Sequence, residues 1–346
     1  MLYVYNKSSV SVCNPGGCID IANEIAPGSR NAVRWSQRRG VLGVVYEFWK
    51  NKGLYAMFIP ACVLLFLFNY LPLFGLVLVF KKFDFGLGIF GSPIQTPWYG
   101  NFIFLFKNDG IFRAVRNTLI NNSLFIVFDT LCAVMLAVFI NEIMNKRIKR
   151  VLQSMTLLPY FISTVIIAVF IYQLFNTDNG MINGLLRAVG IKAVPWYENA
   201  KYWRAILTVI YVWRNCGYRA VIYLATITGI DSALYEAAEI DGAKRYQRIC
   251  YITLPLLIPT MITLTLLAVG RILNSDFTFY YAILGDNSLL FKTTDVLDTF
   301  IFRYLRTLGD FTMSGAASFI QSILSAIILV SFNTLARRYN KDAALF

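Results

Sequence analysis

The chain contains six long apolar stretches, and these constrain its fold more than any other feature of the sequence. A helix needs about 20 mostly apolar residues to cross the hydrocarbon core of a bilayer. Stretches of that length occur at residues 54–80, 117–141, 151–175, 203–230, 251–273 and 314–336. Only 15% of the 346 residues are charged, against about 25% in soluble domains. We therefore predict an all-α membrane protein in which residues 51–346 form six transmembrane helices, preceded by a polar cytoplasmic tail at residues 1–50.

The distribution of positive charge predicts how the six helices are oriented. Six spans place both termini on one side, and cytoplasmic loops are richer in Lys and Arg than outer loops. With the N-terminus inside, seventeen Lys and Arg residues lie in cytoplasmic segments and twelve in outer segments, and the loop NEIMNKRIKR at 141–150 alone carries four. We expect a multi-pass protein of the plasma membrane with cytoplasmic termini. The net charge of +13 then belongs to loops that face lipid headgroups, so it does not indicate nucleic-acid binding.

Several kinds of chemistry lack their usual residues. The sequence contains no histidine and its six cysteines are scattered, so we expect no metal site, no disulfide framework and no histidine-based catalytic dyad. No Gly-Lys dipeptide occurs, so the chain lacks the phosphate-binding loop of ATPases and is expected to bind no cofactor itself. Residues 1–18 have no basic region followed by an apolar run, so we expect no signal peptide.

A strip between the fourth and fifth spans interrupts the apolar sequence with small and charged residues: YEAAEIDGAKRYQRICYITLPLLIP at 235–259. Asp231 or Ser232 can cap a short helix here, because a side-chain oxygen accepts a hydrogen bond from an unpaired backbone N–H. Gly242 permits a tight turn and a close approach by another chain, and the two prolines kink the entry into the next span. The strip is either a helix–glycine–helix elbow that docks a partner or an ordinary amphipathic loop between spans.

The spacing within this strip resembles a known signature. A Glu-Ala-Ala triplet is followed after three residues by Gly and after nine more by Ile-x-Leu-Pro; the residues are Glu236, Ala237, Ala238, Gly242, Ile252, Leu254 and Pro255. This pattern, with Asp241 before the glycine, is similar to the cytoplasmic loop in permease subunits of ATP-binding-cassette (ABC) importers, especially those for carbohydrates. NYLPLFGLVLVFKKF, LLPYFIS and DVLDTFIFRYLRTLGDF likewise resemble the oligosaccharide or polysaccharide permeases common in Gram-positive bacteria.

The resemblance covers most of residues 50–346 and implies a fold, a function and a set of partners. The fold would be the type I ABC importer permease fold, with a coupling helix in the loop 231–255 between helices 4 and 5. The implied function is to form the path for an oligosaccharide by alternating access. The implied partners are a second permease subunit in a heterodimer, two separate ATPase subunits that hold ATP and Mg, and an extracellular sugar-binding lipoprotein.

Polar and aromatic residues in or beside the spans are the candidates for the translocation path, because polar groups inside a membrane are expensive and are usually functional. A sugar path needs hydrogen-bonding groups beside aromatic rings. The candidates fall in three clusters, at the ends of spans three and five and within span four: Tyr172, Gln173, Trp213, Asn215, Tyr218, Arg219, Asn274, Asp276, Phe277 and Tyr280. An arginine-rich lining would also suit an acidic sugar.

Each cluster also has a purely structural interpretation. The aromatic residues can anchor spans at the membrane interface. Arg271 can pair with Asp276, and either Arg214 or Arg219 can pair with Asp129, which is the acid deepest in a span. The pair Asn121-Asn122 in span two is expected to serve packing or a kink.

Two other classes of function remain open at this stage. A membrane-embedded transferase acting on a lipid-linked glycan or a lipid would need clustered carboxylates or a histidine near one membrane face. A channel or secondary transporter would not need the signature at 236–255. Association with an ATPase subunit would separate the importer from both alternatives.

Overall fold

The computed structural model describes residues 3–6, 9–14, 17–20 and 49–339. The chain divides into two compact units, Met1–Phe74 and Gly75–Phe346, which are described in turn.

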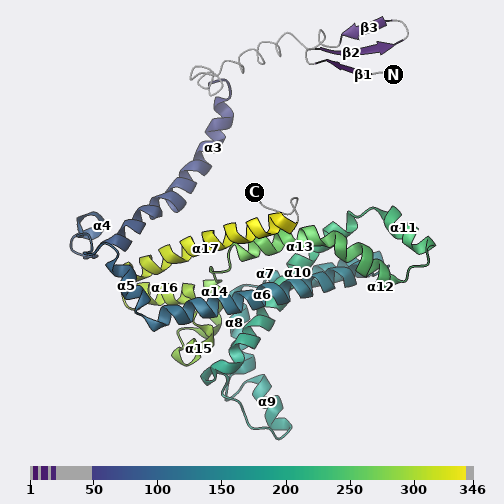
Figure 1. The fold of residues 1–346 in the computed structure, drawn as a ribbon. Coiled ribbons are helices and arrows are strands. Elements are labelled where there is room, and N and C mark those ends of the chain that lie inside the picture. The colour runs from purple at the N-terminus through teal and green to yellow at the C-terminus, as the bar shows by residue number, and fades with distance from the viewer. Residues whose placement is uncertain (1–2, 7–8, 15–16, 21–48, 340–346) are drawn as a thin grey trace. The chain divides into compact units, whose positions relative to one another are not determined.

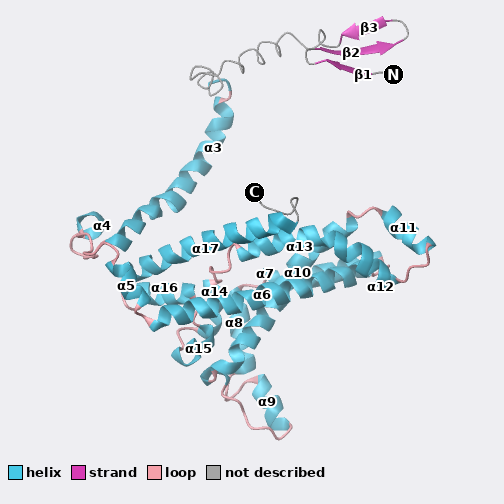
Figure 2. Ribbon diagram, in the orientation of Figure 1, coloured by secondary structure: helices cyan, strands magenta, loops and turns pink. Residues whose placement is uncertain are grey.

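The first unit begins with a small antiparallel sheet, in which β1 (Tyr3–Asn6), β2 (Ser9–Asn14) and β3 (Gly17–Asp20) pair in sequence order (Figure 2). The sequence predicted only a polar tail here, and the all-α prediction was wrong for these three strands. The alternation in SVSV is typical of a strand, but the run is too short to stand out among polar residues. The rest of the predicted tail, residues 21–48, lies outside the described residues.

The first apolar stretch is helical but irregular. The α-helix α3 (Lys52–Leu65) passes into a π-helical turn, η2 (Phe66–Tyr70), and then into a 3-10 stretch, η3 (Leu71–Phe80). Pro72 has no N–H to donate to the preceding turn, so the hydrogen-bond pattern changes just before it. Pro60 lies inside α3, which continues past it to Leu65.

The second unit is helical, and its elements run along the chain as follows: α4 (Gly88–Gly91), α5 (Gly100–Phe106), α6 (Asp109–Asn141), α7 (Lys146–Phe161), α8 (Thr164–Phe175), α9 (Met181–Ala188), η4 (Trp196–Glu198), α10 (Ala200–Thr228), α11 (Ser232–Ile240), α12 (Arg245–Arg248), η5 (Ile249–Thr253), α13 (Leu254–Val269), α14 (Phe277–Leu284), η6 (Ser288–Leu290), α15 (Phe291–Thr294), α16 (Leu297–Arg306) and α17 (Phe311–Tyr339). The long helices α6, α10, α13 and α17 lie along one another, with α11 and α12 at one end and α15 and α16 toward the other (Figure 1).

The number of helices able to cross a membrane is smaller than the six predicted. Within the described residues, four helical stretches are long and apolar enough: Lys52–Phe80, Asp109–Asn141, Arg245–Val269 and Phe311–Arg338. A fifth span results if the bent pair Lys146–Phe161 and Thr164–Phe175 counts as one. The remaining predicted span, 203–230, corresponds to α10, which has 29 residues but carries four Lys and Arg residues that lower its hydropathy.

The third predicted span, 151–175, is broken rather than straight. Its two helices, α7 and α8, meet at an angle of 89°. Ile162 and Ser163 adopt extended backbone conformations between them, three residues after Pro159. Hydropathy reports the composition of a stretch and not the direction of its axis, so the sequence did not predict this bend.

The α7–α10 contact depends on a glycine. A Cβ added to Gly217 of α10 would lie 1.8 Å from the carbonyl oxygen of Thr156 in α7. Small residues allow helix backbones to approach closely in membrane proteins. Gly217 therefore sets the distance between the two helices.

Candidate coupling elbow and translocation cavity

The strip with the Glu-Ala-Ala signature forms an elbow, defined here as residues 231–255. Its first helix, α11, begins at Asp231, whose carboxylate accepts a hydrogen bond of 3.0 Å from the N–H of Ala233. The helix ends at Ile240, and the chain turns at Gly242, which has a φ of 76°. The N–H of Ala243 then donates to the carbonyl of Ala238 at 2.9 Å, which satisfies a carbonyl at the helix end. The predicted cap at Asp231 and the predicted glycine turn are both confirmed.

The two arms of the elbow are tied to each other. The guanidinium of Arg248 lies 3.0 Å from the carboxylate of Glu239, and the hydroxyls of Tyr235 and Thr253 lie 2.9 Å apart. These contacts link α11 to the start of the next span. The two sides of the elbow are therefore linked by two side-chain contacts, of which the Glu239–Arg248 pair lies at the surface.

The signature residues divide into an exposed group and an anchored group. Glu236, Ala237, Asp241 and Gly242 are exposed, and Ala238 is half-buried. Ile252 and Leu254 are half-buried, and Leu254 packs against the apolar cluster that α6, α10 and α13 share. Pro255 stands in the first turn of α13, directly after the π-helical turn η5, and its missing N–H accompanies this change in hydrogen-bond pattern. The first half of the signature thus faces outward and the second half fixes the elbow to the helices.

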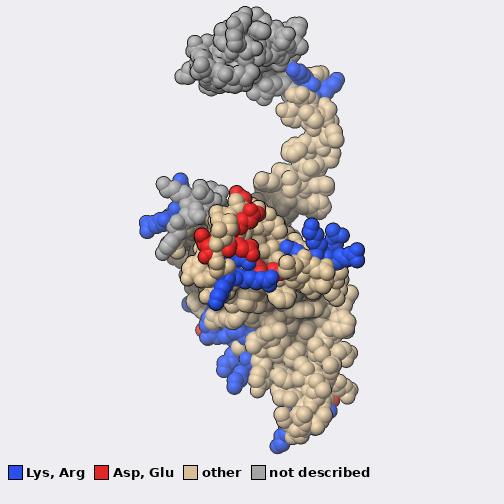
Figure 3. All heavy atoms as spheres, turned by 90° about the vertical axis from the view of Figure 1, so that its right-hand side faces the viewer, with Lys and Arg blue, Asp and Glu red and all other residues tan. Residues whose placement is uncertain are grey.

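The face of the molecule that carries the elbow is strongly charged. Figure 3 shows acidic side chains gathered near its middle with Lys and Arg beside them. The elbow itself supplies both signs, because α11 and its turn carry acids and the following residues carry bases: Glu236, Glu239, Asp241, Lys244, Arg245 and Arg248. Arg245 lies 3.8 Å from the sulfur of Met144, so the basic loop 141–150 lies beside the elbow at the same end.

The helices α6, α10 and α13 enclose a central cavity of about 660 Å³. Its polar lining comes from α6, from the middle of α10 and from the segment after α13: Asn122, Tyr211, Tyr218, Arg219, Arg271, Asn274, Ser275 and Asp276. The rest of the lining is aliphatic or aromatic, including Phe125 and Leu267. Four of the candidates named from the sequence, Tyr218, Arg219, Asn274 and Asp276, therefore meet here.

The other candidates lie elsewhere. Tyr172 and Phe277 line a separate, mainly apolar cavity of about 470 Å³ between α8 and α14. Gln173 and Trp213 are exposed and line neither of these two cavities.

Two further candidates have structural contacts. Asn215 donates to the carbonyl of Tyr211 one turn earlier in α10, at 2.8 Å. Tyr280 is only 1% exposed and packs edge-on against Phe279 in the core. Its position in the core differs from the lining role proposed from the sequence, because an aromatic run does not reveal which ring faces inward.

Ion pairs neutralise two of the three arginines at or beside the central cavity. Nε of Arg219 lies 2.9 Å from Oδ2 of Asp129, a carboxylate with no exposed surface, although the two groups are not aligned as a hydrogen bond. Arg214 lies 3.4 Å from Asp276. The pairing of Asp129 with Arg219 is one of the two alternatives left open by the sequence, and the pairing of Asp276 with Arg271 is not observed.

Stacked aromatic rings form part of the cavity wall. Tyr218 stacks on Tyr160 of α7 with ring centres 4.7 Å apart. Tyr211 stacks on Phe125 with ring centres 4.2 Å apart. These contacts fix the orientation of both tyrosines, so their hydroxyls and free edges are presented in defined positions.

A row of asparagines on α6 joins this helix to distant segments, in line with the packing role expected for Asn121 and Asn122, and Asn122 also lines the cavity. Asn122 donates to the carbonyl of Ile272 at 2.6 Å. Asn121 donates to the carbonyl of Thr293 and accepts from Arg204. The spacing of these asparagines with Asn117 on one helix face was a usable signal, and hydrogen bonding to distant carbonyls is how such groups are satisfied in an apolar setting.

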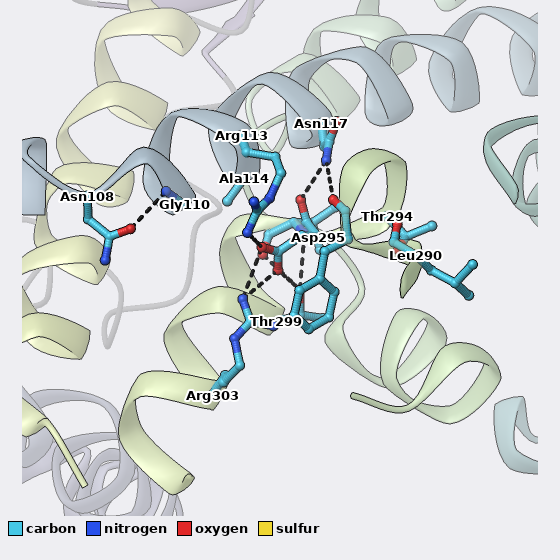
Figure 4. Close-up of polar contacts among 12 residues, drawn as sticks. Asn108, Gly110, Arg113, Ala114, Asn117, Leu290, Thr294, Asp295, Thr299 and Arg303 are labelled. Atoms are coloured by element: carbon cyan, nitrogen blue, oxygen red, sulfur yellow. Dashed lines mark hydrogen bonds and ion pairs between the residues drawn. The ribbon is translucent and has the colours of Figure 1, made fainter. Parts of the chain in front are cut away.

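The same row continues into a buried polar cluster between α6, α15 and α16 (Figure 4). Asp295 has no exposed side-chain surface and accepts from Arg303 at 2.9 Å and 3.0 Å and from Arg113 at 3.2 Å. Asn117 donates to the backbone carbonyls of Asp295 and Phe291. We call these contacts the Asp295 clamp, because they hold the 287–303 segment against α6.

Within residues 49–339, the structure contains no group of three or more His, Cys, Asp or Glu side chains arranged to hold a metal ion. The residues of the central cavity are instead hydrogen-bonding groups, guanidinium groups and aromatic rings. This combination suits a polar organic molecule with an apolar face.

Comparison with known proteins places the chain in a family. Residues 130–343 match the profile of the binding-protein-dependent transport system inner membrane component. Protein LplB of Bacillus subtilis is 30% identical over 321 residues, which cover 92% of this chain and 99% of LplB. The polygalacturonan/rhamnogalacturonan transport system permease protein YteP of the same organism is 30% identical, with 85% of this chain and 90% of YteP covered.

A solved structure agrees with this assignment. A chain of a bacterial ABC transporter involved in the import of the acidic polysaccharide alginate superposes with a TM-score of 0.77 and 30% identity, covering 86% of this chain and 99% of that chain. The family profile over residues 130–343 includes the elbow and the helices α10 and α13. The chain belongs to the binding-protein-dependent transport system inner membrane component family, as a non-catalytic permease subunit of an ABC importer.

Proposed function

We propose that this chain forms one side of the path by which an oligosaccharide crosses the membrane, and that the elbow couples this path to separate ATPase subunits. The proposal rests on one observation: the same two helices form walls of the central cavity and connect to the elbow. The helix α10 lines the central cavity with Tyr218 and Arg219 and leads directly into the elbow at Asp231. The helix α13 leaves the elbow at Pro255 and ends beside Arg271, another cavity residue. A displacement of the elbow is therefore transmitted to both walls of the cavity.

The proposed fold is the six-span type I permease fold, with α10 as the fourth span. Its 29 residues give a length of about 44 Å, which exceeds the ~30 Å hydrocarbon core. Two of its charges face Asp129 and Asp276 rather than lipid, and ionisable groups within spans usually pair in this way. The elbow and the basic loop 141–150 lie at one end, and we assign that end to the cytoplasm with both termini.

The proposed partners follow from the surfaces that the chain offers. The elbow exposes Ile240 and Tyr246, which are 87% and 61% accessible, between charges of both signs. Such a mixture fits a groove on an ATPase subunit that carries ATP and Mg. A second, different permease subunit would complete the path, and an extracellular sugar-binding lipoprotein would deliver the substrate. A bacterial alginate ABC transporter with 30% identity to this chain has been solved in complex with an alginate pentasaccharide-bound periplasmic protein, which supports the delivery step.

Reconstitution of the full complex tests the proposal. The chain, its partner permease and the ATPases are purified together and placed in liposomes with ATP inside and the binding protein with labelled oligosaccharide outside. We expect uptake that requires ATP hydrolysis and stops with a non-hydrolysable analogue. Failure to co-purify with any ATPase, or turnover of a lipid-linked glycan by the isolated chain, would contradict the proposal and favour the transferase.

A further inference from the structure

One arginine that lines the central cavity has no carboxylate partner. Arg219 and Arg214 each face a carboxylate, at 2.9 Å and 3.4 Å. Arg271 lines the same cavity, and its guanidinium forms no ion pair with any residue in the described part of the chain. The carboxylate of Asp298 accepts a hydrogen bond from the backbone N–H of Ser275, another lining residue, at 2.6 Å. Arg271 therefore brings to the cavity a positive charge that no carboxylate of the described residues engages.

The backbone that carries Arg271 is held in place from three directions. The carbonyl of Arg271 accepts from the N–H of Asn274 at 2.9 Å. The next two carbonyls, of Ile272 and Leu273, accept from the side chains of Asn122 at 2.6 Å and Gln321 at 2.8 Å. Ile272 and Leu273 are themselves buried. The side chain of Arg271 is exposed and lines the cavity, and the fixed backbone sets the point from which the guanidinium reaches a ligand.

A guanidinium group in such a position recognises a carboxylate better than a hydroxyl. Its planar N–H donors match the two oxygens of a carboxylate, and hydrogen bonds between two charged groups are roughly twice as strong as neutral ones. A neutral sugar offers Arg271 only neutral hydrogen-bond acceptors, so the charge-assisted pair with a carboxylate is not formed. The hydroxyls of Tyr211 and Tyr218 and the side chains of Asn122 and Asn274 remain for sugar hydroxyl groups.

We infer that the central cavity selects oligosaccharides with uronic acid residues and that Arg271 is the residue that reads the carboxylate. The inference rests on the proposed function and deepens it by naming the charge class of the substrate. Arg214 and Arg219 serve a different purpose, because their carboxylate partners belong to the protein. They position Asp276 and α10 and contribute no net charge to selection.

The test compares trigalacturonate with the same trimer after methyl esterification, which removes each negative charge and adds one methyl group to each carboxyl. Binding of each to the purified permease–ATPase complex, without the binding protein, is measured at low and high NaCl concentration. The wild-type complex should bind the acid about tenfold more tightly than the ester, and this preference should shrink as salt increases. Arg271→Gln should lose most of the preference, and Arg271→Lys should keep part of it.

A matched control is Arg306→Gln, which removes an exposed arginine in the last turn of α16, outside the central cavity. It should leave the ratio of the two affinities unchanged. The inference is overturned if Arg271→Gln binds both probes as the wild type does, or if it weakens both equally, as loss of a structural contact or of a partner-subunit ion pair would. Failure of the proposed function has a different signature, namely no ATP-driven uptake of any oligosaccharide by the reconstituted wild-type complex.

Discussion

At the scale of single residues, the absence of a side chain at Gly217 matters as much as any contact. A methyl group at this position would overlap the carbonyl oxygen of Thr156, which is backbone and has little freedom to move. We predict that Gly217→Ala lowers the stability of the folded chain by about 1–3 kcal/mol, the range for overpacked cores. Thermal unfolding of the purified complex in detergent measures this loss.

The control for this prediction is Gly229→Ala at the end of α10. A Cβ there would meet its nearest neighbour at 3.4 Å, and the backbone has an ordinary φ of −86°. The control should unfold within a degree or two of the wild type. Equal unfolding temperatures for both variants would show that α7 and α10 can separate freely, contrary to the structure.

Asp298 in α16 provides a prediction about pH. Burial raises the pKa of Asp298 above its usual value of 3.8, and hydrogen bonds from the N–H of Ser275 and the amide of Gln321 offset part of the effect. Because the folded state holds this proton more tightly than the unfolded state does, its contribution to stability is largest below the usual pKa. The contribution is then lost as the pH rises through the raised pKa.

The difference in unfolding temperature between the wild type and Asp298→Asn isolates this group from all others. We expect the wild type to lose stability relative to the variant as the pH rises from about 4 toward neutrality. A difference that stays constant, or that grows in favour of the wild type, would mean that the carboxylate is better solvated in the folded state than its burial indicates.

At the scale of elements, the Asp295 clamp joins α6 to α16 through one carboxylate. Asp295→Asn leaves Arg303, which is 16% exposed, without its buried partner and weakens the contact with Arg113. We predict a loss of about 3 kcal/mol in folding stability, typical of breaking a buried pair. Hydrogen exchange should become faster in the 287–303 segment, because this segment depends on the clamp.

The matched control is Asp286→Asn, which removes the other carboxylate beside Arg303. That pair lies at 3.3 Å, but the side chain of Asp286 is 42% exposed. Exposed pairs contribute at most about 1 kcal/mol, so this variant should behave almost as the wild type. Equal losses of folding stability in the two variants would show that the burial of Asp295 does not make its ion pair more important than that of Asp286.

The elements also show what sequence reasoning can and cannot reach. Long apolar runs predict the helical stretches, because hydropathy and length depend on local composition alone. The break at residues 162–163 and the asparagine contacts on α6 were not predicted, because they depend on where remote segments lie. Asn122, for example, donates to a carbonyl 150 residues away, and no local pattern identifies that partner.

The same distinction applies to the site. The elbow was predictable in detail because its cap at Asp231 and its turn at Gly242 are local features with specific residue preferences. In the central cavity, Tyr218 and Asp276 were found because polar groups stand out in apolar sequence. Tyr280 was misplaced and Tyr211 was missed, because aromatic residues are common on every face of these helices.

At the scale of the whole molecule, the proposed coupling role makes the elbow the connection between the cavity helices α10 and α13. The Glu239–Arg248 pair and the contact between the hydroxyls of Tyr235 and Thr253 link its two sides. Gly242 lies at the turn of the elbow with a φ of 76° and with open space around its missing side chain. A β-branched residue there would distort the turn without disturbing any packing in the core.

The measurement that tests this account most directly is ATP-driven oligosaccharide uptake by the reconstituted complex carrying Gly242→Val, compared with Gly184→Val. Gly184 lies in α9, also with open space around it but without a positive φ. Strain of 1–3 kcal/mol at the turn should reduce ATPase docking and uptake by about tenfold in Gly242→Val, while Gly184→Val transports normally. Normal docking and normal uptake in Gly242→Val would show that the elbow does not transmit the work of ATP hydrolysis to the cavity.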